Sequence, residues 1–157
     1  MSKTIERTLV LVKPDGIQRG LIGNIINRFE DKGLKMIGLK MMNLDDVMLE
    51  AHYAHMADRP FFSSIKDYMK SSPVVAMVWE GGEGAVAAVR ILVGPTKGQE
   101  APAGTIRGDY GLSGSNNIVH ASDSVENGAS EVSRFFTKEE LFSYEKTQDL
   151  HIYGNSG

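Results

Sequence analysis

Short apolar runs alternate with amphipathic segments along most of the chain. Residues 8–13 (TLVLVK) and 74–79 (VVAMVW) are rich in β-branched and apolar side chains, which is typical of buried strands. Two more strands are expected at 34–42, where lysines and methionines blur the alternation, and at 117–120. Proline, aspartate and glycine at 14–16 predict a turn after the first strand.

Apolar residues at helical spacing predict helices between these strands. The first helix has its apolar face over residues 21–29 and ends at Gly33, the residue type that most often follows a helix C-terminus. A second helix begins at Asp45 and is expected to carry His52 and His55. Further helices are expected over 61–69 and 85–93.

A long connection precedes the last strand and the last helix. Residues 94–109 are rich in glycine and proline, and a connection of this length in a compact domain is either functional or disordered. Asp123 or Ser124 is expected to cap the final helix, which runs through Phe135. Asp123 and Glu126 have the spacing of a capping box.

The order of these elements predicts the fold class. Few strands interleaved with helices indicate an α/β sandwich in which helices cover the sheet. The length of 157 residues fits a single domain over 1–157, and 41% apolar with 24% charged residues argues against disorder. The polar tail, 137–157, is expected to wrap the surface or a neighbouring subunit.

Composition removes several classes of function. Without cysteine the chain has no disulfide framework, thiolate zinc site or cysteine nucleophile, and this suits a reducing cytoplasm. A net charge of -3 argues against a nucleic-acid partner but leaves room for a local basic pocket. Nowhere do about 18 apolar residues run together, so neither a membrane span nor a signal peptide is expected.

Two patterns that imitate known sites are better explained by ordinary structure. Residues 82–87 (GEGAVA) resemble a dinucleotide fingerprint, but Pro95 follows too soon for a complete βαβ unit. A Walker loop is excluded because the chain has no Gly-Lys dipeptide. His52 and His55 could ligate a metal from one helix face, but no third ligand is evident, so surface or core histidines are favoured.

Several basic residues at strand ends and on loops together suit a triphosphate. Each alone is a typical solvated charge, but arginine forks match phosphate oxygens and lysine supplies a compact point charge. Phe61 and Phe62 offer an aromatic face on which a base could stack, and core packing is the equal alternative for Phe61. The basic residues of this group are Lys13, Arg59, Arg90 and Arg107, and the hydroxyl of Thr96 lies among them in the sequence.

His120 is the candidate nucleophile. A strand-end histidine often does no more than bond a nearby carbonyl, but here a helix N-terminus, which favours a bound anion, follows at once. An imidazole is mostly neutral at pH 7 and therefore attacks without a separate base. Ser122 is two residues away, and Glu131 on the last helix could orient one ring nitrogen while the other attacks. The residues leave open which nitrogen takes which role.

The stretch 117–124, NIVHASDS, is similar to the active-site motif of the nucleoside diphosphate kinase family. The stretches TLVLVKPDG, HYAHMADRPFF, PVVAMVWEG, GPT, GTIRGDYG and SVENGASEVSRFF also have counterparts there in the same order. The resemblance covers nearly the whole chain. It implies a ferredoxin-like sandwich, with a four-stranded antiparallel sheet covered by helices.

The resemblance also implies an activity. A nucleoside triphosphate, mainly ATP, would pass its terminal phosphoryl group to a nucleoside diphosphate through a phosphohistidine, in ping-pong fashion and with broad base specificity. His120 would be the nucleophile, supported by Ser122 and Glu131. Phe61 would stack on the base, and Arg59 would lie near the phosphates. The transferred group and the sugar would be surrounded by Lys13, Tyr53, Arg107 and Asn117. The outer phosphates would be held by Arg90 and Thr96.

The same resemblance implies a cofactor and an assembly. Mg²⁺ would arrive with the nucleotide, held mostly by phosphate oxygens, and Asp123 would either touch it through water or only cap the helix. The family forms hexamers or tetramers, and the tail and the long 94–109 connection favour a homo-hexamer in the cytoplasm.

Two departures and two rival functions stay open. Gly114 stands where the family has an apolar side chain closing the base slot, and Asn116 replaces a common arginine, so Ile65 would carry more of the clamp. A nucleotide sensor without turnover is one rival, although His120, Lys13 and Arg107 are all present. A histidine-dependent phosphohydrolase is the other, and it would need a second acid or base close to His120.

Overall fold

A four-stranded sheet forms the centre of the structure, a computed structural model that describes residues 3–154. All three pairs of neighbouring strands are antiparallel, in the order β2-β3-β1-β4. This arrangement confirms the predicted ferredoxin-like α+β sandwich. The strands are β1 (Glu6–Val12), β2 (Lys35–Met42), β3 (Val74–Gly81) and β4 (Val119–Ala121).

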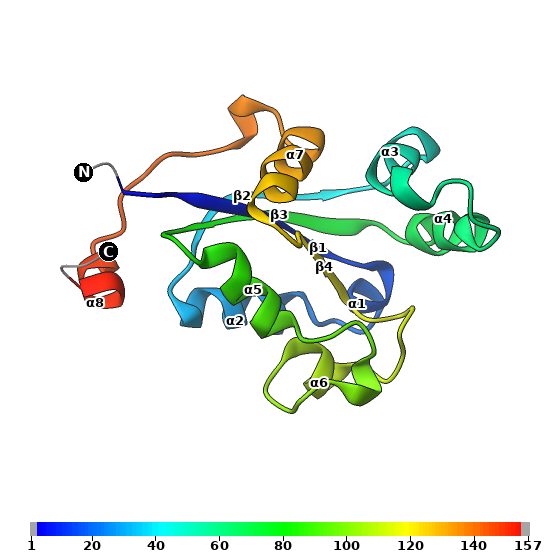
Figure 1. The fold of residues 1–157 in the computed structure, drawn as a ribbon, viewed down its shortest axis with the longest axis horizontal. Helices are drawn as coiled ribbons and strands as arrows, with labels where there is room; N and C mark the ends of the chain where they lie inside the picture. The colour runs from blue at the N-terminus through cyan, green and yellow to red at the C-terminus, as the bar shows by residue number, and fades with distance from the viewer. Residues whose placement is uncertain (1–2, 155–157) are drawn as a thin grey trace.

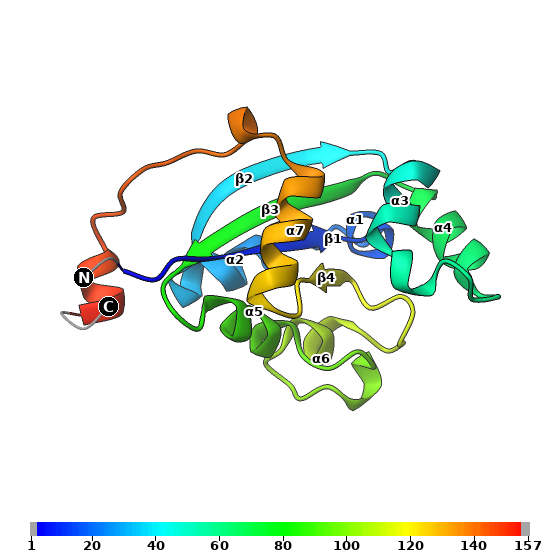
Figure 2. The same cartoon turned by 45° about the horizontal axis from the view of Figure 1, so that its top comes forward.

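Helices cover both faces of the sheet. Figure 1 shows α2 and α5 on one side and α7 on the other, with α3 and α4 beyond one end of the strands. Figure 2 shows α7 crossing over the strands. The helices are α1 (Pro14–Gln18), α2 (Ile22–Lys32), α3 (Asp46–His52), α4 (Phe62–Lys70), α5 (Ala85–Val93), α6 (Ile106–Tyr110), α7 (Val125–Phe135) and α8 (Asp149–Tyr153), with 3-10 turns at Ala54–Met56, Gly98–Glu100 and Lys138–Glu140.

The alternation of side chains along the strands divides the core into two layers. On β1, Val10 and Val12 pack with α2 and α5, whereas Leu9 and Leu11 pack with α3, α4 and α7. Because both faces of the sheet are covered, β3 is buried over seven of its eight residues. Its sequence is therefore a nearly continuous apolar run rather than an alternating one. This burial explains why 74–79 gives the clearest strand signal in the sequence.

The same alternation decides which way His120 faces. Val119 and Ala121 on β4 belong to the layer with α2 and α5, so His120 between them faces the α7 side. Helix α7 approaches the sheet closely there because it carries Gly128. A Cβ at that position would lie 2.3 Å from the carbonyl oxygen of Arg7.

Three local expectations were wrong. Ser124 alone caps α7, accepting from the Asn127 backbone N–H at 3.1 Å, so the capping box of Asp123 and Glu126 does not form. His55 lies in the 3-10 turn that follows α3 and not on the helix of His52. Pro14 starts the short helix α1 where only a turn was expected, which suits a proline at the first helical position.

The long connection is ordered, and so is the tail as far as residue 154; residues 155–157 of the predicted tail lie outside the described residues. Residues 94–109 contain a 3-10 turn and the start of α6, and the buried Arg107 side chain ties this segment to the sheet. The tail lies on its own chain: Phe142 N–H donates to the Ile37 carbonyl at 2.9 Å, and the Tyr153 hydroxyl accepts from Gly82 N–H at 3.2 Å. Among the described helices, none has the length and apolar character that a bilayer crossing requires.

Candidate active site

A strained turn leads directly into β4 and His120. Ile118 has φ 77°, and in the described part of the chain it is the one residue other than glycine with a positive φ. The Val119 N–H donates to the Asn117 carbonyl at 2.9 Å, which closes a γ-turn around Ile118. A β-branched residue in this conformation costs about 1–3 kcal/mol, so its surroundings must hold it there.

The start of α1 and the end of β1 hold this turn. Lys13 N–H donates to the Ile118 carbonyl at 2.8 Å, and Ile118 N–H donates to Asp15 Oδ2 at 3.1 Å. The Tyr68 hydroxyl donates to the other oxygen of Asp15. Burial, followed by this hydrogen bond, raises the pKa of Tyr68, which keeps the hydroxyl protonated.

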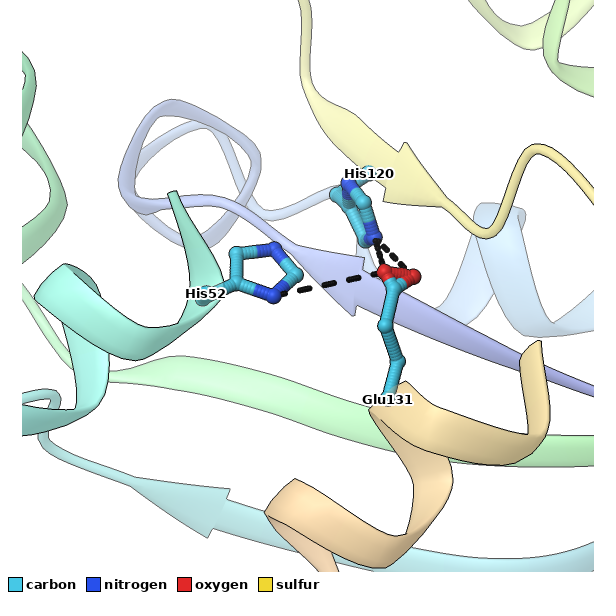
Figure 3. Close-up of side chains that lie close together, drawn as sticks. All are labelled: His52, His120 and Glu131. Atoms are coloured by element: carbon cyan, nitrogen blue, oxygen red, sulfur yellow. Dashed lines mark hydrogen bonds and ion pairs between the residues drawn. The ribbon is translucent and has the colours of Figure 1, made fainter. Parts of the chain in front are cut away.

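Glu131 fixes the orientation of the His120 ring. His120 Nε2 lies 2.9 Å from both carboxylate oxygens (Figure 3). The Ser122 hydroxyl donates to Oε1 at 2.9 Å. Burial raises the pKa of Glu131, but the hydrogen bonds from His120 and Ser122 outweigh it and hold that pKa below its ordinary value. A carboxylate only accepts, so Nε2 carries the proton and Nδ1 is left with a free lone pair.

His52 packs edge-on against His120. The two ring centroids lie 4.6 Å apart at 78°, and the His52 side chain is only 2% exposed. Its Nδ1 lies 4.0 Å from Glu131 Oε2 and 3.4 Å from Arg134 Nη1. Burial, with a smaller effect of the His120 charge, lowers the pKa of His52 to about 3, so this imidazole is neutral at pH 7.

An open pocket of about 540 Å³ adjoins His120. Tyr53, Arg90 and Asp123 line it together with residues from α3, the 3-10 turn and α7. The α7 residues are spaced i, i+3, i+4 and i+7, which places them on one face of the helix. They are Asn127, Ser130, Glu131 and Arg134.

A second polar cluster lies at the start of the γ-turn. Lys13 Nζ donates to Asn117 Oδ1 at 2.7 Å, and the Asn117 amide donates to the carbonyls of Thr96 and Gly114 at 3.0 and 3.2 Å. Burial, with a smaller effect of the nearby Arg107 charge, lowers the pKa of Lys13 to about 8. The lysine is therefore a cation at pH 7, with a raised tendency to release its proton.

Arg107 braces the segment that carries His120. Its guanidinium donates to the carbonyls of Gly94, Asn117 and Val119 at 3.1, 3.2 and 2.7 Å. Arg90 donates to the Ala121 carbonyl at 3.1 Å, on the other side of His120. Burial, and then the charge of Arg90, lowers the pKa of Arg107 to about 10, so Arg107 is still a cation at pH 7.

Of the predicted nucleotide residues, Tyr53 and Arg90 line the pocket, and Lys13, Arg107 and Asn117 belong to the cluster around the γ-turn. The side chains of the other three lie outside both groups. Arg59 and Phe61 are exposed on the connection before α4, and Phe61 has 52% of its surface free. Thr96 is exposed as well, and its carbonyl rather than its hydroxyl contacts Asn117. Ile65, the expected clamp residue, is partly buried against the core on the α3 and α7 side.

Sequence reasoning missed several residues that this geometry involves. His52 is buried, as the core alternative predicts, but its contact with His120 was not foreseen. Arg134 and Asp15 were given no role. The signal for Arg134 was the polar stripe on α7, which continues past Glu131 by one helical turn. The contact of Asp15 with Ile118 spans 103 residues and had no signal in the sequence.

Comparison with known proteins shows the family of the chain. The family model described as nucleoside diphosphate kinase matches residues 6–141. A nucleoside diphosphate kinase of Carboxydothermus hydrogenoformans is 50% identical over 149 residues, covering 95% of this chain and 99% of that one. One from Archaeoglobus fulgidus is 51% identical over 149 residues, covering 95% and 98%.

Solved structures show the same fold. The halophilic nucleoside diphosphate kinase of Halobacterium salinarum, solved in complex with CDP, has a TM-score of 0.90 at 46% identity, covering 94% of this chain and 98% of that one. A nucleoside diphosphate kinase family protein from Babesia bovis has a TM-score of 0.91 at 47% identity, covering 94% and 99%. The chain belongs to the nucleoside diphosphate kinase family.

Proposed function

We propose that His120 is the residue that carries the phosphoryl group in this enzyme. As a nucleoside diphosphate kinase, the chain transfers the terminal phosphoryl group of a nucleoside triphosphate to a nucleoside diphosphate, through a phosphohistidine and in ping-pong fashion. The observation that supports His120 is its double contact with Glu131 at 2.9 Å, which leaves Nδ1 free beside an open pocket.

The reaction then runs in two matched halves. In the first, the Nδ1 lone pair bonds to the terminal phosphorus, the bond to the bridging oxygen breaks, and a nucleoside diphosphate leaves. In the second, a terminal oxygen of another nucleoside diphosphate attacks that phosphorus and the N–P bond breaks. In both halves Glu131 accepts the hydrogen bond from Nε2, so the proton stays on Nε2. The carboxylate also stabilises the positive charge of the ring while Nδ1 is bonded to phosphorus.

We assign the phosphates to the cationic residues around the γ-turn. Phosphoryl transfer depends mainly on positioning and charge stabilisation, which Lys13, Arg90 and Arg107 can supply. Three of the five N–H groups of Arg107 donate to carbonyl oxygens, so two remain to donate to a phosphate oxygen. An anion next to Lys13 raises the pKa of that side chain, so the lysine stays charged when nucleotide binds.

The remaining assignments concern the sugar, the base and the outer phosphates. Tyr53 and Asn117 are proposed to contact the sugar and the transferred group, and Thr96 and Arg59 the outer phosphates. Phe61, half exposed at the start of α4, is proposed to stack on the base without reading its edge, which would give broad base specificity with ATP as the main donor.

Mg²⁺ is the proposed cofactor. The exposed Asp123 carboxylate lines the pocket, and Asn127 Nδ2 donates to only one of its oxygens, at 2.6 Å. That hydrogen bond lowers the pKa of Asp123, which keeps it ionised and suited to hold a metal-bound water. The ion would neutralise charge on the phosphates that hold it.

We further propose a homo-hexamer in the cytoplasm, with a tetramer as the alternative. The edge strand β2 leaves Leu39 and Met41 52% and 59% exposed, and the loop after α6 leaves Leu112 88% exposed. These side chains suit subunit contacts. Light scattering tests the assembly: a mass six times the 17.2 kDa of the chain is expected, and a monomer would contradict it.

Labelling tests the role of His120. With Mg²⁺ and terminally labelled ATP, the wild type should acquire an acid-labile, alkali-stable label that GDP removes as GTP. His120→Gln should acquire none, whereas His151→Gln, altered at an exposed histidine of α8, should behave as wild type. Label that remains in His120→Gln would contradict the assignment. Transfer of the labelled phosphoryl group to water alone would favour a phosphohydrolase. A wild-type protein that binds nucleotide but acquires no label would favour a sensor.

A further inference from the structure

Two histidines and a glutamate from three separate elements converge beside the pocket. We propose that His52, His120 and Glu131 form a site for a late transition-metal ion such as Zn²⁺, and that the bound ion blocks phosphorylation of His120. The blocking step rests on the proposed role of His120 as nucleophile. The metal site itself does not depend on that role.

The ligand atoms of the three side chains already lie close together. One nitrogen or oxygen from each falls within 4.8 Å of the others, and no other such group of three occurs in residues 3–154. They come from the end of α3, from β4 and from α7, and Figure 3 shows both histidines beside the Glu131 carboxylate. In a tetrahedral zinc site with bonds of about 2.0–2.2 Å, two ligand atoms lie roughly 3.4 Å apart, so the widest pair of these atoms has to close by at most about 1.4 Å.

The types of these ligands select the class of metal. Two imidazoles and one carboxylate are a ligand set of open zinc sites, in which water takes the fourth position. Mg²⁺ and Ca²⁺ prefer oxygen ligands and are disfavoured by imidazole. The adjoining pocket of about 540 Å³ gives the ion a path of entry and room for the water.

Neighbouring groups hold the ligands in place before any metal binds. The Ser122 hydroxyl bonds Glu131 Oε1 and accepts the Leu9 N–H at 3.0 Å, so Oε2 is the oxygen turned toward His52. The His52 ring also packs edge-on against Phe135, with centroids 5.2 Å apart. Pre-organisation of this kind raises metal affinity, because less ordering is left for the binding step.

One cation competes for the site. Arg134 Nη1 lies 3.4 Å from His52 Nδ1, the far limit of a hydrogen bond, and it must turn away when a metal enters. Its side chain is partly exposed in the last turn of α7, so it can swing toward solvent. Arg134→Gln should therefore bind Zn²⁺ more tightly than the wild type does.

A metal on Nε2 would reverse the tautomer of His120. Without metal, the ring proton is on Nε2 and donates to Glu131, and Nδ1 has the lone pair that attacks phosphorus. When Nε2 coordinates Zn²⁺, it gives up its proton to solvent and Nδ1 takes up one proton from solvent, because a neutral imidazole has one N–H. The Nδ1 lone pair is then no longer available, although nothing blocks the nucleotide itself.

Metal binding is tested first, on the full metal-free chain with Zn²⁺ alone as the probe. Calorimetry should give one equivalent per chain, and His52→Gln should weaken binding at least about 10-fold. His55→Gln changes the other histidine of the pocket and His151→Gln a remote one; both should bind as wild type does. No binding in the wild type would overturn the proposal. Equal affinity in His52→Gln, or loss confined to His55→Gln, would do so too.

Because His52 is buried, His52→Gln could misfold. A measurement on the unmodified chain therefore tests the site without that variant. Zn²⁺ should shift the ring nitrogen resonances of His52 and His120 together, at one equivalent, and leave those of His151 unchanged. Shifts at His151 with none at His52 and His120 would place the metal elsewhere and refute the site.

The blocking step has its own readout. At equal free Zn²⁺, the wild type should form phosphohistidine at least about 10-fold more slowly than without metal, with ADP affinity unchanged, whereas His52→Gln should keep its own metal-free rate. Because Zn²⁺ also binds ATP, that variant is the matched control. Zn²⁺-loaded wild type that reacts at full rate would refute blocking. A chain that forms no phosphohistidine even without metal would refute the proposed function and leave the metal measurements to stand.

Discussion

The contact between Glu131 and His120 decides which nitrogen of a single ring is chemically available. The carboxylate accepts from Nε2 through both oxygens at 2.9 Å, and Ser122 prevents it from turning away. An amide in its place would keep the size but would stabilise the cationic ring less and could donate as well as accept. The tautomer would then no longer be fixed.

Glu131→Gln should therefore slow phosphohistidine formation by roughly 10²-fold while the affinity for ADP stays unchanged. Rapid-quench measurement of the first half-reaction separates this rate from nucleotide binding. Glu126→Gln is the matched control, because it alters an exposed glutamate on the same helix. If Glu131→Gln and Glu126→Gln reacted at the same rate, the orienting role of Glu131 would be wrong.

Lys13 makes nucleotide binding depend on pH. Burial and Arg107 lower its pKa to about 8, so the free enzyme loses this cation as the pH rises above 8. A bound phosphate favours the charged form, and binding must therefore take up a proton in this range. We expect ADP affinity to decline from pH 8 to pH 9.5, with proton uptake detected by calorimetry in two buffers of different ionisation enthalpy. Flat affinity without uptake would contradict the assignment.

The sequence predicted His120 as the nucleophile, with Ser122 and Glu131 as its supports. It did not predict that His52 packs against His120. NIVHASDS places His120 and Ser122 within three residues, and helical spacing brings Glu131 near them. His52 reaches His120 only because the end of α3 packs against β4 and α7 in the fold, which is a tertiary effect. The direction of Nδ1 likewise follows from side-chain geometry and has no sequence signal.

At the scale of elements, the γ-turn before β4 transmits support from α1 to His120. Asp15 accepts the buried Ile118 N–H, and an unpaired buried N–H costs about 1–3 kcal/mol. Asp15→Ala should lower the free energy of unfolding by that amount and slow phosphohistidine formation. Urea unfolding and rapid quench measure the two effects.

Asp15→Asn is the matched control for this turn. The amide keeps an oxygen that can accept from Ile118 N–H, so the stability should largely return. If Asp15→Ala were as stable and as active as the wild type, the proposed support of the γ-turn by Asp15 would be wrong.

The pattern of apolar residues predicted all four strands and five longer helices but not the short-range details. Because β3 is buried on both faces, its sequence is apolar enough to predict the strand clearly. Gly33, with φ 103°, ends α2 as expected. The cap of α7 by Ser124 and the γ-turn at Ile118 depend on single hydrogen bonds, so periodicity does not reveal them. The order in the connection 94–109 comes from the buried side chain of Arg107.

For the molecule as a whole, a neutral buried histidine links stability to pH. His52 titrates near 6.5 when unfolded, whereas burial lowers its pKa to about 3 in the fold. Between these values the unfolded chain binds more protons, so the free energy of unfolding should fall as the pH falls below 6.5. At pH 5 the loss should be about 2 kcal/mol relative to pH 7.5.

Chemical unfolding at several pH values checks this linkage. His52→Gln removes the titrating ring and should flatten the profile between pH 5 and 7, whatever its absolute stability. An equal slope in wild type and His52→Gln would show that another group is responsible.

The contact with Glu131 leaves Nδ1 of His120 as the attacking atom. Phosphorus–nitrogen coupling in the NMR spectrum of the ¹⁵N-labelled phosphoenzyme tests it most directly. The structure predicts one phosphorus on His120, coupled to Nδ1, with Nε2 still protonated. Phosphorus on Nε2, or on any residue other than His120, would contradict the account.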